Sequence, residues 1–271
     1  LAFIKRSCAQ ANGELELLDG QVSGAVVRAA DEVLAGKMDG HFPVDVFQTG
    51  SGTSWNMNMN EVLARRAGEL FLEAGAAGEH GEPGEPAAAE GPEGAGQRIH
   101  PNDAVNLGQS SNDVIPSAIN IACRLEGECL SVEIGRLAET LEEKEREFAG
   151  VVKLGRTHLQ DAVPITLGQE ISAWKEQVRR AGERLDRALA ECETLPLGGT
   201  AVGTGLNTST AFSERAVGII AEMTGVPFRP DGNRFVGISA RDESLSLMSA
   251  LNGAAVVYAK IAQDLRLLSG G

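Results

Sequence analysis

Residues 247–268, LMSALNGAAVVYAKIAQDLRLL, carry the clearest periodic pattern in the chain. Their apolar residues recur at alternating intervals of four and three, at Leu247, Leu251, Ala254, Tyr258, Ile261, Leu265 and Leu268. This spacing places the side chains on one face of an α-helix, as in the a/d seam of a coiled coil. The pattern predicts a long helix that packs against partner helices. Those partners lie either in other subunits, as the core of an assembly, or within the same chain.

Two other long segments repeat apolar residues at helical intervals. One covers residues 171–189, with Ile171, Trp174, Val178, Ala181, Leu185 and Leu189. The other runs from about Ile115 to Phe148, with Ile119, Leu125, Ile134, Leu137 and Leu141, and Pro116 suits its first turn. Further helices are predicted within residues 1–36 and from about Asn58 to Glu73. Strand-like alternation of comparable length is not seen, so we predict an all-α fold built on a long-helix bundle.

Composition narrows the classes of partner. The formal net charge of −14 repels nucleic-acid phosphates and anionic membranes. Lys260 interrupts the best apolar run, so we expect no membrane span. The four cysteines, Cys8, Cys123, Cys129 and Cys192, lack CxxC spacing and indicate a reducing cytoplasm. We expect no metal, because HExxH and Cys/His ligand spacings are missing, and no cofactor, because Gly203-Thr-Gly205 lacks the third glycine of a dinucleotide fingerprint.

Four polar blocks each precede a predicted helix, at residues 48–61, 99–117, 153–169 and 198–207. They are rich in small residues, amides and hydroxyls, and free backbone N–H groups at helix starts can bind carboxylate oxygens. Taken singly, each block is better explained by ordinary helix caps and turns. Residues 74–96 consist almost wholly of Ala, Gly, Glu and Pro, which predicts a mobile surface loop.

In combination, the blocks resemble those of the fumarase/aspartase superfamily. TGSGTSWNMNMNE at 49–61 resembles the SGTxxNMNxNE block, and HPND at 100–103 with QSSND at 109–113 resembles the second. KLGRTHLQD at 153–161 with LGQE at 167–170 resembles the third, and GGTAVGTGLN at 198–207 the fourth. The resemblance implies an L-aspartase-like fold with a partial N-terminal domain at 1–110, interrupted by an insertion at 74–96. A partial central helical-bundle domain would follow at 111–271, without the C-terminal domain.

Within the superfamily, the chain is most similar to the class II fumarate hydratases, which are metal-independent homotetramers. Ser51 stands where aspartases more often carry Ala, and His158 where many carry Gln. The resemblance implies reversible hydration of fumarate to (S)-malate, a step of the tricarboxylic acid cycle, on a small dicarboxylate substrate. Two alternatives stay open: an aspartate ammonia-lyase, and a non-catalytic helical module that serves assembly.

The resemblance also implies roles for particular residues. The substrate would be bound by Ser51, Gly52, Thr53, Ser110, Ser111, Asn112 and Thr157. His158 would act in acid/base catalysis on the water or hydroxyl side. A second anion site would be formed by His100, Pro101, Asn102 and Asp103. Two departures are visible: Gln97 stands where the family often has Arg, and Trp55 where it usually has Ser or Thr.

In this family each active site is assembled from three chains. One contributes the block at 110–112, another contributes Thr157 with His158, and the third contributes a GSSxMPxKxNP loop with the proton-abstracting Ser. That loop does not occur in this sequence, which begins with Leu1 and ends at Gly271 behind a predicted helix. We therefore expect a fragment truncated at both ends, inactive by itself, of an active homotetrameric parent.

Overall fold

The computed structural model describes residues 1–78 and 99–270. These form two compact units: the first comprises residues 1–119 and 193–241, and the second residues 120–192 and 242–271. The boundary expected between residues 110 and 111 does not coincide with this division. Residues 193–241 fold with the first unit although they lie far along the chain, and this return of the chain left no signal in the sequence.

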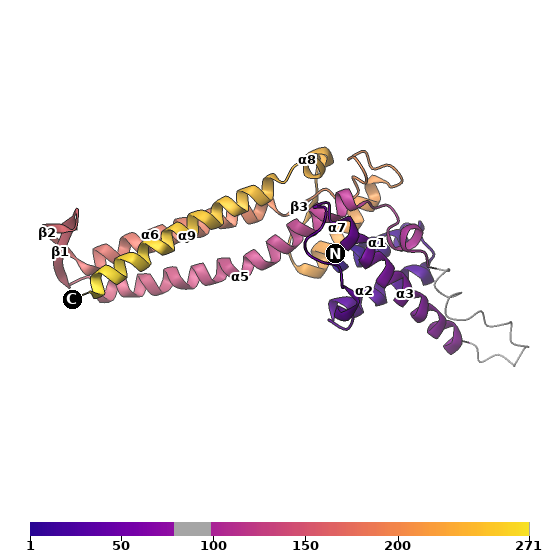
Figure 1. Ribbon diagram of the computed structural model, residues 1–271, viewed down its shortest axis with the longest axis horizontal. Coiled ribbons are helices and arrows are strands. Elements are labelled where there is room, and N and C mark those ends of the chain that lie inside the picture. Colours follow the sequence, from indigo (N-terminus) through magenta and orange to yellow (C-terminus); the bar gives the residue numbers. More distant parts are fainter. Residues whose placement is uncertain (79–98, 271) are drawn as a thin grey trace, which may run out of the picture. The chain divides into compact units, whose positions relative to one another are not determined.

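The first unit is a cluster of helices around the N-terminal pair (Figure 1). Its elements are α1 (Ala2–Glu14), α2 (Gly20–Leu34), η1 (Asp39–His41), α3 (Thr53–Gly78), η2 (Pro101–Val105), the start of α5 (Ser111–Glu147), β3 (Thr194–Leu195), α7 (Thr210–Thr224), β4 (Arg229–Pro230) and α8 (Arg234–Ser239). Helix α1 packs against α2 and α7, and α2 packs against α3. Strands β3 and β4 form a short parallel pair.

The core of the first unit is built largely from small aliphatic side chains. Its buried members include Ala9, Ala25, Ala29, Ala30, Leu63, Ala64, Ala67, Ile99 and Val105. Small residues let helix backbones approach closely. A Cβ atom on Gly13 of α1 would lie 2.4 Å from Ser23 Oγ of α2, so only glycine fits there. The side chain of Asp19 caps α2 by accepting from the backbone N–H groups of Gln21 and Val22.

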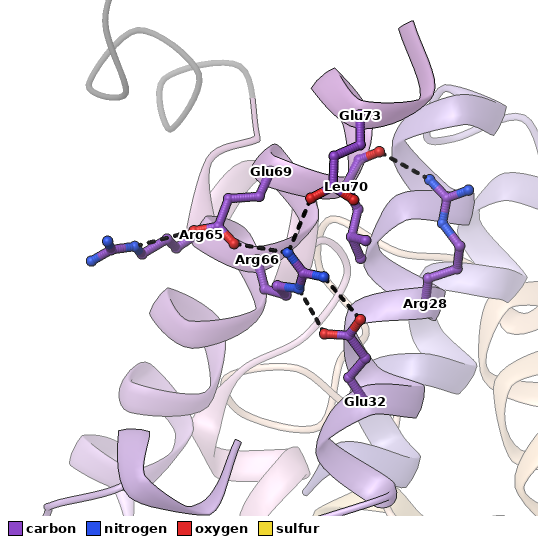
Figure 2. A network of polar contacts seen from close by, with 7 residues as sticks. All are labelled: Arg28, Glu32, Arg65, Arg66, Glu69, Leu70 and Glu73. Carbon is purple, nitrogen blue, oxygen red and sulfur yellow. Dashed lines mark hydrogen bonds and ion pairs between the residues drawn. The ribbon is translucent and has the colours of Figure 1, made fainter. Parts of the chain in front are cut away.

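An ion-pair network joins the surfaces of α2 and α3 (Figure 2). The Arg66 guanidinium on α3 binds both carboxylate oxygens of Glu32 on α2, with Nε 2.6 Å from Oε2 and Nη2 3.0 Å from Oε1. The same guanidinium lies 2.9 Å from Glu69 and 3.5 Å from Glu73. Arg28 Nη2 donates to the Leu70 carbonyl at 3.4 Å. These contacts hold the middle of α3 against α2.

The second unit is a bundle of long helices. It contains α5 from Asn120 onward, β1 (Val152–Thr157), β2 (Gln160–Thr166), α6 (Leu167–Glu191) and α9 (Asp242–Ser269). Helices α6 and α9 run side by side (Figure 1). Ile171, Trp174, Val178 and Leu185 of α6 pack with Leu247, Ala250 and Ile261 of α9 in one core cluster. The mainly helical fold confirms the predicted all-α class and its long helices.

The seam that predicted α9 packs within the chain. Leu247, Ala254 and Ile261 are buried, and Leu251, Tyr258 and Leu268 are partly buried in the same cluster as α6. Leu265 alone remains largely exposed among the seam residues. The intrachain alternative therefore accounts for this face of the helix.

Several predicted boundaries were wrong. Helix α3 starts at Thr53, five residues before the expected Asn58, and continues to Gly78, so residues 74–78 are helical rather than a loop. The remainder of the expected loop lies outside the described residues. Helix α5 begins at Ser111, which puts Pro116 beyond its first turn. These helix starts were not predicted because their residues are polar, and apolar periodicity marks only the buried part of a helix.

Strands β1 and β2 form an antiparallel hairpin that the sequence analysis did not predict. All but a few of its residues are exposed, so neither strand has the alternation of apolar and polar residues that signals a half-buried sheet. Thr157 pairs with Gln160 across a two-residue turn of His158 and Leu159. The third polar block is therefore this hairpin and the start of α6.

Helix α9 is long and apolar enough, by length and composition, to cross a membrane, with a window of mean hydropathy 1.4. The expectation that Lys260 leaves no such segment was wrong by this measure. Hydropathy cannot distinguish a membrane helix from a core helix of a bundle, because both require uninterrupted apolar residues. Only 17% of that window is buried within the chain.

Candidate active site

The second polar block forms a capping box at the start of α5. Ser110 Oγ accepts the Asn112 backbone N–H at 3.2 Å, and Asp113 Oδ1 accepts the Ser110 backbone N–H at 2.9 Å. The two side chains thereby satisfy backbone donors reciprocally. This arrangement fixes the turn that carries Ser110, Ser111 and Asn112.

Asp113 also binds the fourth polar block. Its second carboxylate oxygen, Oδ2, accepts the backbone N–H groups of Gly198 at 3.0 Å and Thr200 at 2.8 Å. Burial raises the pKa of Asp113 to about 6, although the three backbone donors and Lys5 oppose the shift. The Asn112 amide adds a further link by donating to the Ala201 carbonyl at 2.8 Å. A single turn of α5 thus holds residues 198–201 in place.

Asn56 connects the first block to the second. It lies on α3, only 1% exposed, and its Nδ2 donates to Ser111 Oγ at 3.0 Å. Because the Ser111 oxygen accepts this bond, its own hydroxyl hydrogen is free for another acceptor. The backbone is also close here, since a Cβ on Gly52 would lie 2.8 Å from Ile115 Cδ1 of α5. Gly52 has φ +69°, which likewise favours glycine.

The hydroxyls of the first block form a short exposed chain. Ser51 Oγ lies 3.2 Å from Thr49 Oγ1 and donates to Thr53 Oγ1 at 3.2 Å. Thr53 is the first residue of α3. The first and second polar blocks therefore meet in the first unit, where Asn56 contacts Ser111 and Gly52 approaches Ile115.

The residues of the expected second anion site form a separate turn at η2. His100 precedes Pro101, and its Nδ1 accepts the backbone N–H groups of Asn102 and Asp103 at 3.3 Å each. The same nitrogen lies 3.1 Å from Asp103 Oδ2, a contact that becomes an ion pair only when the ring is protonated. In the neutral ring, His100 itself occupies the two N–H groups that an anion would use.

Thr157 and His158 belong to the second unit, at the tip of the β1–β2 hairpin. Both side chains are exposed. His158 has φ +50° and Leu159 φ +60°, the left-handed region that a type I′ turn requires at both central positions. Asn and Gly suit these positions, and His adopts them more often than most residues, whereas Leu is strained there.

Sequence reasoning overlooked two residues that organise the site. Asn56 and Asp113 lie inside the quoted blocks, but neither was assigned a role. The capping-box spacing of Ser110 and Asp113 was a readable signal. Nothing in the sequence could pair Asn56 with Ser111, because they lie far apart along the chain. Among the described residues, there is no group of three or more His, Cys, Asp or Glu side chains that could hold a metal ion.

An all-α fold of this kind, with polar blocks gathered at the start of a long helix, is that of the aspartase-like lyases. The lyase family matches residues 1–271, and the chain belongs to that family.

The most similar relatives include two fumarate hydratases. The chain is 46% identical over 272 residues to the class II fumarate hydratase of Chromobacterium violaceum, of which it covers 55%. It is 44% identical over 270 residues to the mitochondrial fumarate hydratase of Rattus norvegicus, of which it covers 50%. The chain thus spans about half the length of the curated relatives it matches.

Solved structures agree with this assignment. The class II fumarase of Schistosoma mansoni matches with a TM-score of 0.88 and 36% identity, over 100% of this chain and 56% of that one. The fumarate lyase:delta crystallin structure from Brucella melitensis, bound to cobalt, matches with a TM-score of 0.87 and 40% identity, over 100% of this chain and 55% of that one.

Proposed function

We propose that the whole protein to which this chain contributes catalyses the reversible hydration of fumarate to (S)-malate. The observation that carries the proposal is the identity of 44–46% to class II fumarate hydratases across almost the whole chain. The geometry of the first unit supports it, because neutral hydroxyl and amide donors gather at the start of α5. In a chain of net charge −14, such local donors are what a dicarboxylate substrate needs.

In this proposal the substrate carboxylates are bound by Ser51, Gly52, Thr53, Ser110, Ser111, Asn112 and Thr157. Hydration passes through an intermediate with an additional negative charge on one carboxylate, and fixed donors stabilise that charge without reorganising. His158 exchanges the proton on the water or hydroxyl side. An imidazole suits this step because its ordinary pKa lies near neutrality.

The proposal includes a homotetramer, because its sites combine residues from different chains. Support comes from the face of α9 that lies opposite the seam. Leu245, Met248, Val256 and Leu267 are each 59–68% exposed, and at 100° per residue they share one stripe. Exposed apolar stripes of this kind are typical of subunit interfaces. We propose that helices of other copies cover this stripe, in a cytoplasmic enzyme of the tricarboxylic acid cycle.

The test is fumarate hydration by the whole protein, followed by the absorbance of the fumarate double bond. Replacing His158→Asn is expected to lower the rate by about two orders of magnitude, the scale of acid/base catalysis. Asn tolerates a positive φ, so the hairpin turn is kept. His41→Asn, an exposed histidine outside the four blocks, is the matched control and should retain full activity.

The outcomes separate the alternatives. An unchanged rate in His158→Asn removes the acid/base role from His158. Turnover of aspartate in place of malate identifies an ammonia-lyase. A lack of turnover on either substrate identifies a helical assembly module.

His100, Pro101, Asn102 and Asp103 are proposed as a second anion site, with one structural condition. An anion must displace the His100 ring from the two N–H groups that it occupies. His100→Ala is therefore expected to strengthen, rather than abolish, anion binding to the Asn102 and Asp103 N–H groups. Anion titration followed by the amide chemical shifts of these two residues tests this, and weaker binding in the variant would contradict it.

A further inference from the structure

Lys5 on α1 lies beside the candidate substrate-binding turn, yet it belongs to none of the four polar blocks. Its side chain is completely buried. The ammonium group donates to two amide oxygens, Asn106 Oδ1 and Gln109 Oε1, at 2.8 Å each. A lysine is almost never fully buried without such partners.

The ammonium group determines how these two amides are oriented. It can only donate, so each amide must present its oxygen to Lys5 and turn its nitrogen away. The Gln109 nitrogen accordingly donates to the carbonyls of Val105 at 3.0 Å and Leu107 at 3.3 Å. The Asn106 nitrogen donates to the Gln109 carbonyl at 3.3 Å. Lys5 thereby holds the turn that leads from η2 into α5.

The orientation is passed on to Ser111 through Asn56. Asn106 Oδ1, held by Lys5, also lies 3.4 Å from Asn56 Nδ2. The same Asn56 nitrogen donates to Ser111 Oγ at 3.0 Å. A rotation of the Asn106 amide would place two N–H groups face to face and repel Asn56. The direction of the Ser111 hydroxyl thus depends on a chain of contacts that starts at Lys5.

A buried carboxylate favours a cation at this position, because Asp113 on α5 interacts electrostatically with Lys5. Burial lowers the pKa of Lys5 to about 7, whereas Asp113 opposes this shift. Burying an ammonium group costs free energy, which its hydrogen bonds must offset. A buried cation is therefore better explained by its contacts with the turn than by stability.

We propose that Lys5 is a positioning residue for substrate binding, acting through Asn106 and Asn56 to keep the Ser111 hydroxyl hydrogen free for a substrate carboxylate. The inference rests on the proposed function only in naming a dicarboxylate as the ligand. Lys5 does not touch the substrate, so its effect must be expressed through Ser111.

The experiment is a double-mutant cycle in the whole protein, combining Lys5→Met with Ser111→Ala. Lys5→Met keeps an unbranched side chain but removes both hydrogen bonds. We expect kcat/KM for malate to fall about tenfold, the scale of one lost hydrogen bond, mainly through a higher KM. In a background that already carries Ser111→Ala, the same change should have little further effect, because the two residues act in one pathway.

Ile4→Val is the control for a merely structural effect. Ile4 is the neighbouring, fully buried residue of α1 and takes no part in the polar network. Its replacement is expected to lower the free energy of unfolding without changing kcat/KM. If Lys5→Met does not fold, Asn56→Ala breaks the same pathway without removing the buried charge. It should show the same loss and the same non-additivity.

Two kinetic results would overturn the inference: effects of Lys5→Met and Ser111→Ala that multiply, or an Asn56→Ala enzyme with the KM of the wild type. A crystal structure of Lys5→Met supplies a readout that does not depend on activity. We expect the Asn56–Ser111 distance to exceed about 3.5 Å, beyond a hydrogen bond. A bond that persists disproves the positioning role. Absence of fumarate turnover in the wild type would instead contradict the proposed function. The Asn56–Ser111 distance in the Lys5→Met structure would still test the positioning role of Lys5.

Discussion

Two buried charges lie close together in the first unit, Lys5 on α1 and Asp113 on α5. Each is held by neutral groups: Lys5 by two amide oxygens, and Asp113 by three backbone N–H groups. Amide dipoles stabilise each charge without cancelling it. A direct ion pair would cancel both charges. The carboxylate therefore organises two loops at once, and its protonation state should affect the stability of the unit.

The pKa of Asp113, about 6, is higher than its ordinary value of 3.8. The folded state thus binds this proton more tightly than the unfolded state. The stabilising contribution is complete at low pH and is lost as the pH rises through 6. We expect the free energy of unfolding of the wild type, minus that of Asp113→Asn, to be lower at neutral pH than at pH 4. The decrease should be on the order of 3 kcal/mol.

Urea unfolding of both proteins at the two pH values measures this decrease, and the Asn variant serves as the control because it does not titrate. A difference that stays constant with pH would show that Asp113 has its ordinary pKa. A difference that grows with pH would reverse the assigned sign.

Strain is also localised at single residues of the hairpin tip. Leu159 has φ +60° and is 72% exposed, so it suffers the penalty of the left-handed region without gaining burial. Leu159→Gly is expected to stabilise the hairpin by about 1 kcal/mol. Hydrogen exchange of the β1 and β2 amides should slow by about fivefold. Leu206→Gly is the matched control, since Leu206 is 71% exposed but is not among the residues with positive φ.

Faster hydrogen exchange in Leu159→Gly would show that the leucine side chain stabilises the turn. An equal protective effect of Leu206→Gly would show that the gain does not come from relief of the positive φ.

At the level of elements, α5 and α6 of the second unit approach closely where α6 begins. Gly168, the second residue of α6, would carry a Cβ 2.7 Å from the Glu145 carbonyl oxygen and 2.8 Å from Ala149 Cα. Both neighbours are backbone atoms, which cannot move aside as a flexible side chain can. The capping box of Thr166 and Gln169 fixes the direction of α6 at the same place.

Gly168→Ala is expected to lower the free energy of unfolding by about 2 kcal/mol, because the added methyl group must displace backbone. Gly135→Ala is the matched control on α5, where nothing lies within 4 Å of an added Cβ. That variant should be stabilising by about 0.5–1 kcal/mol, the helix propensity of Ala over Gly. Denaturant unfolding of the two variants measures both values. Equal effects would refute the close contact at Gly168.

At the level of the whole molecule, α9 has two apolar faces. The seam face is covered by α6, whereas Leu245, Met248, Val256 and Leu267 remain exposed on the opposite face. Such a helix satisfies the composition of a membrane span, but it equally satisfies that of a helix between two layers of a larger bundle. The assembly state of the whole protein distinguishes these possibilities.

Met248→Glu combined with Val256→Glu places two charges in the exposed stripe. We expect sedimentation to show that the proposed tetramer dissociates while the circular dichroism of the subunit stays helical, because both side chains are largely exposed within the chain. Ala262→Glu, an exposed position outside the stripe, should leave the assembly intact. A tetramer that survives the double change would show that this stripe is not the subunit interface. If the wild type binds lipid vesicles and the double variant does not, the stripe is a membrane surface instead.

The sequence by itself determined the helical class, the three long helices and the location of the polar blocks. Periodicity marks a helix wherever one face is buried, and the motif spacing is local. Local spacing likewise makes the capping box of Ser110 and Asp113 readable from four consecutive residues. The family matched by the chain confirms the class that these patterns predicted.

Only the tertiary structure decided which distant residues meet. Asn56 reaches Ser111, Asp113 binds residues 198–200, and Lys5 orients Asn106 across a separation of 101 residues. It also showed that the α9 seam packs within the chain, and that the third block is an exposed hairpin with His158 at its strained tip. The physical reason is that buried polar contacts satisfy individual donors and acceptors, and single pairs leave no periodic trace in the sequence.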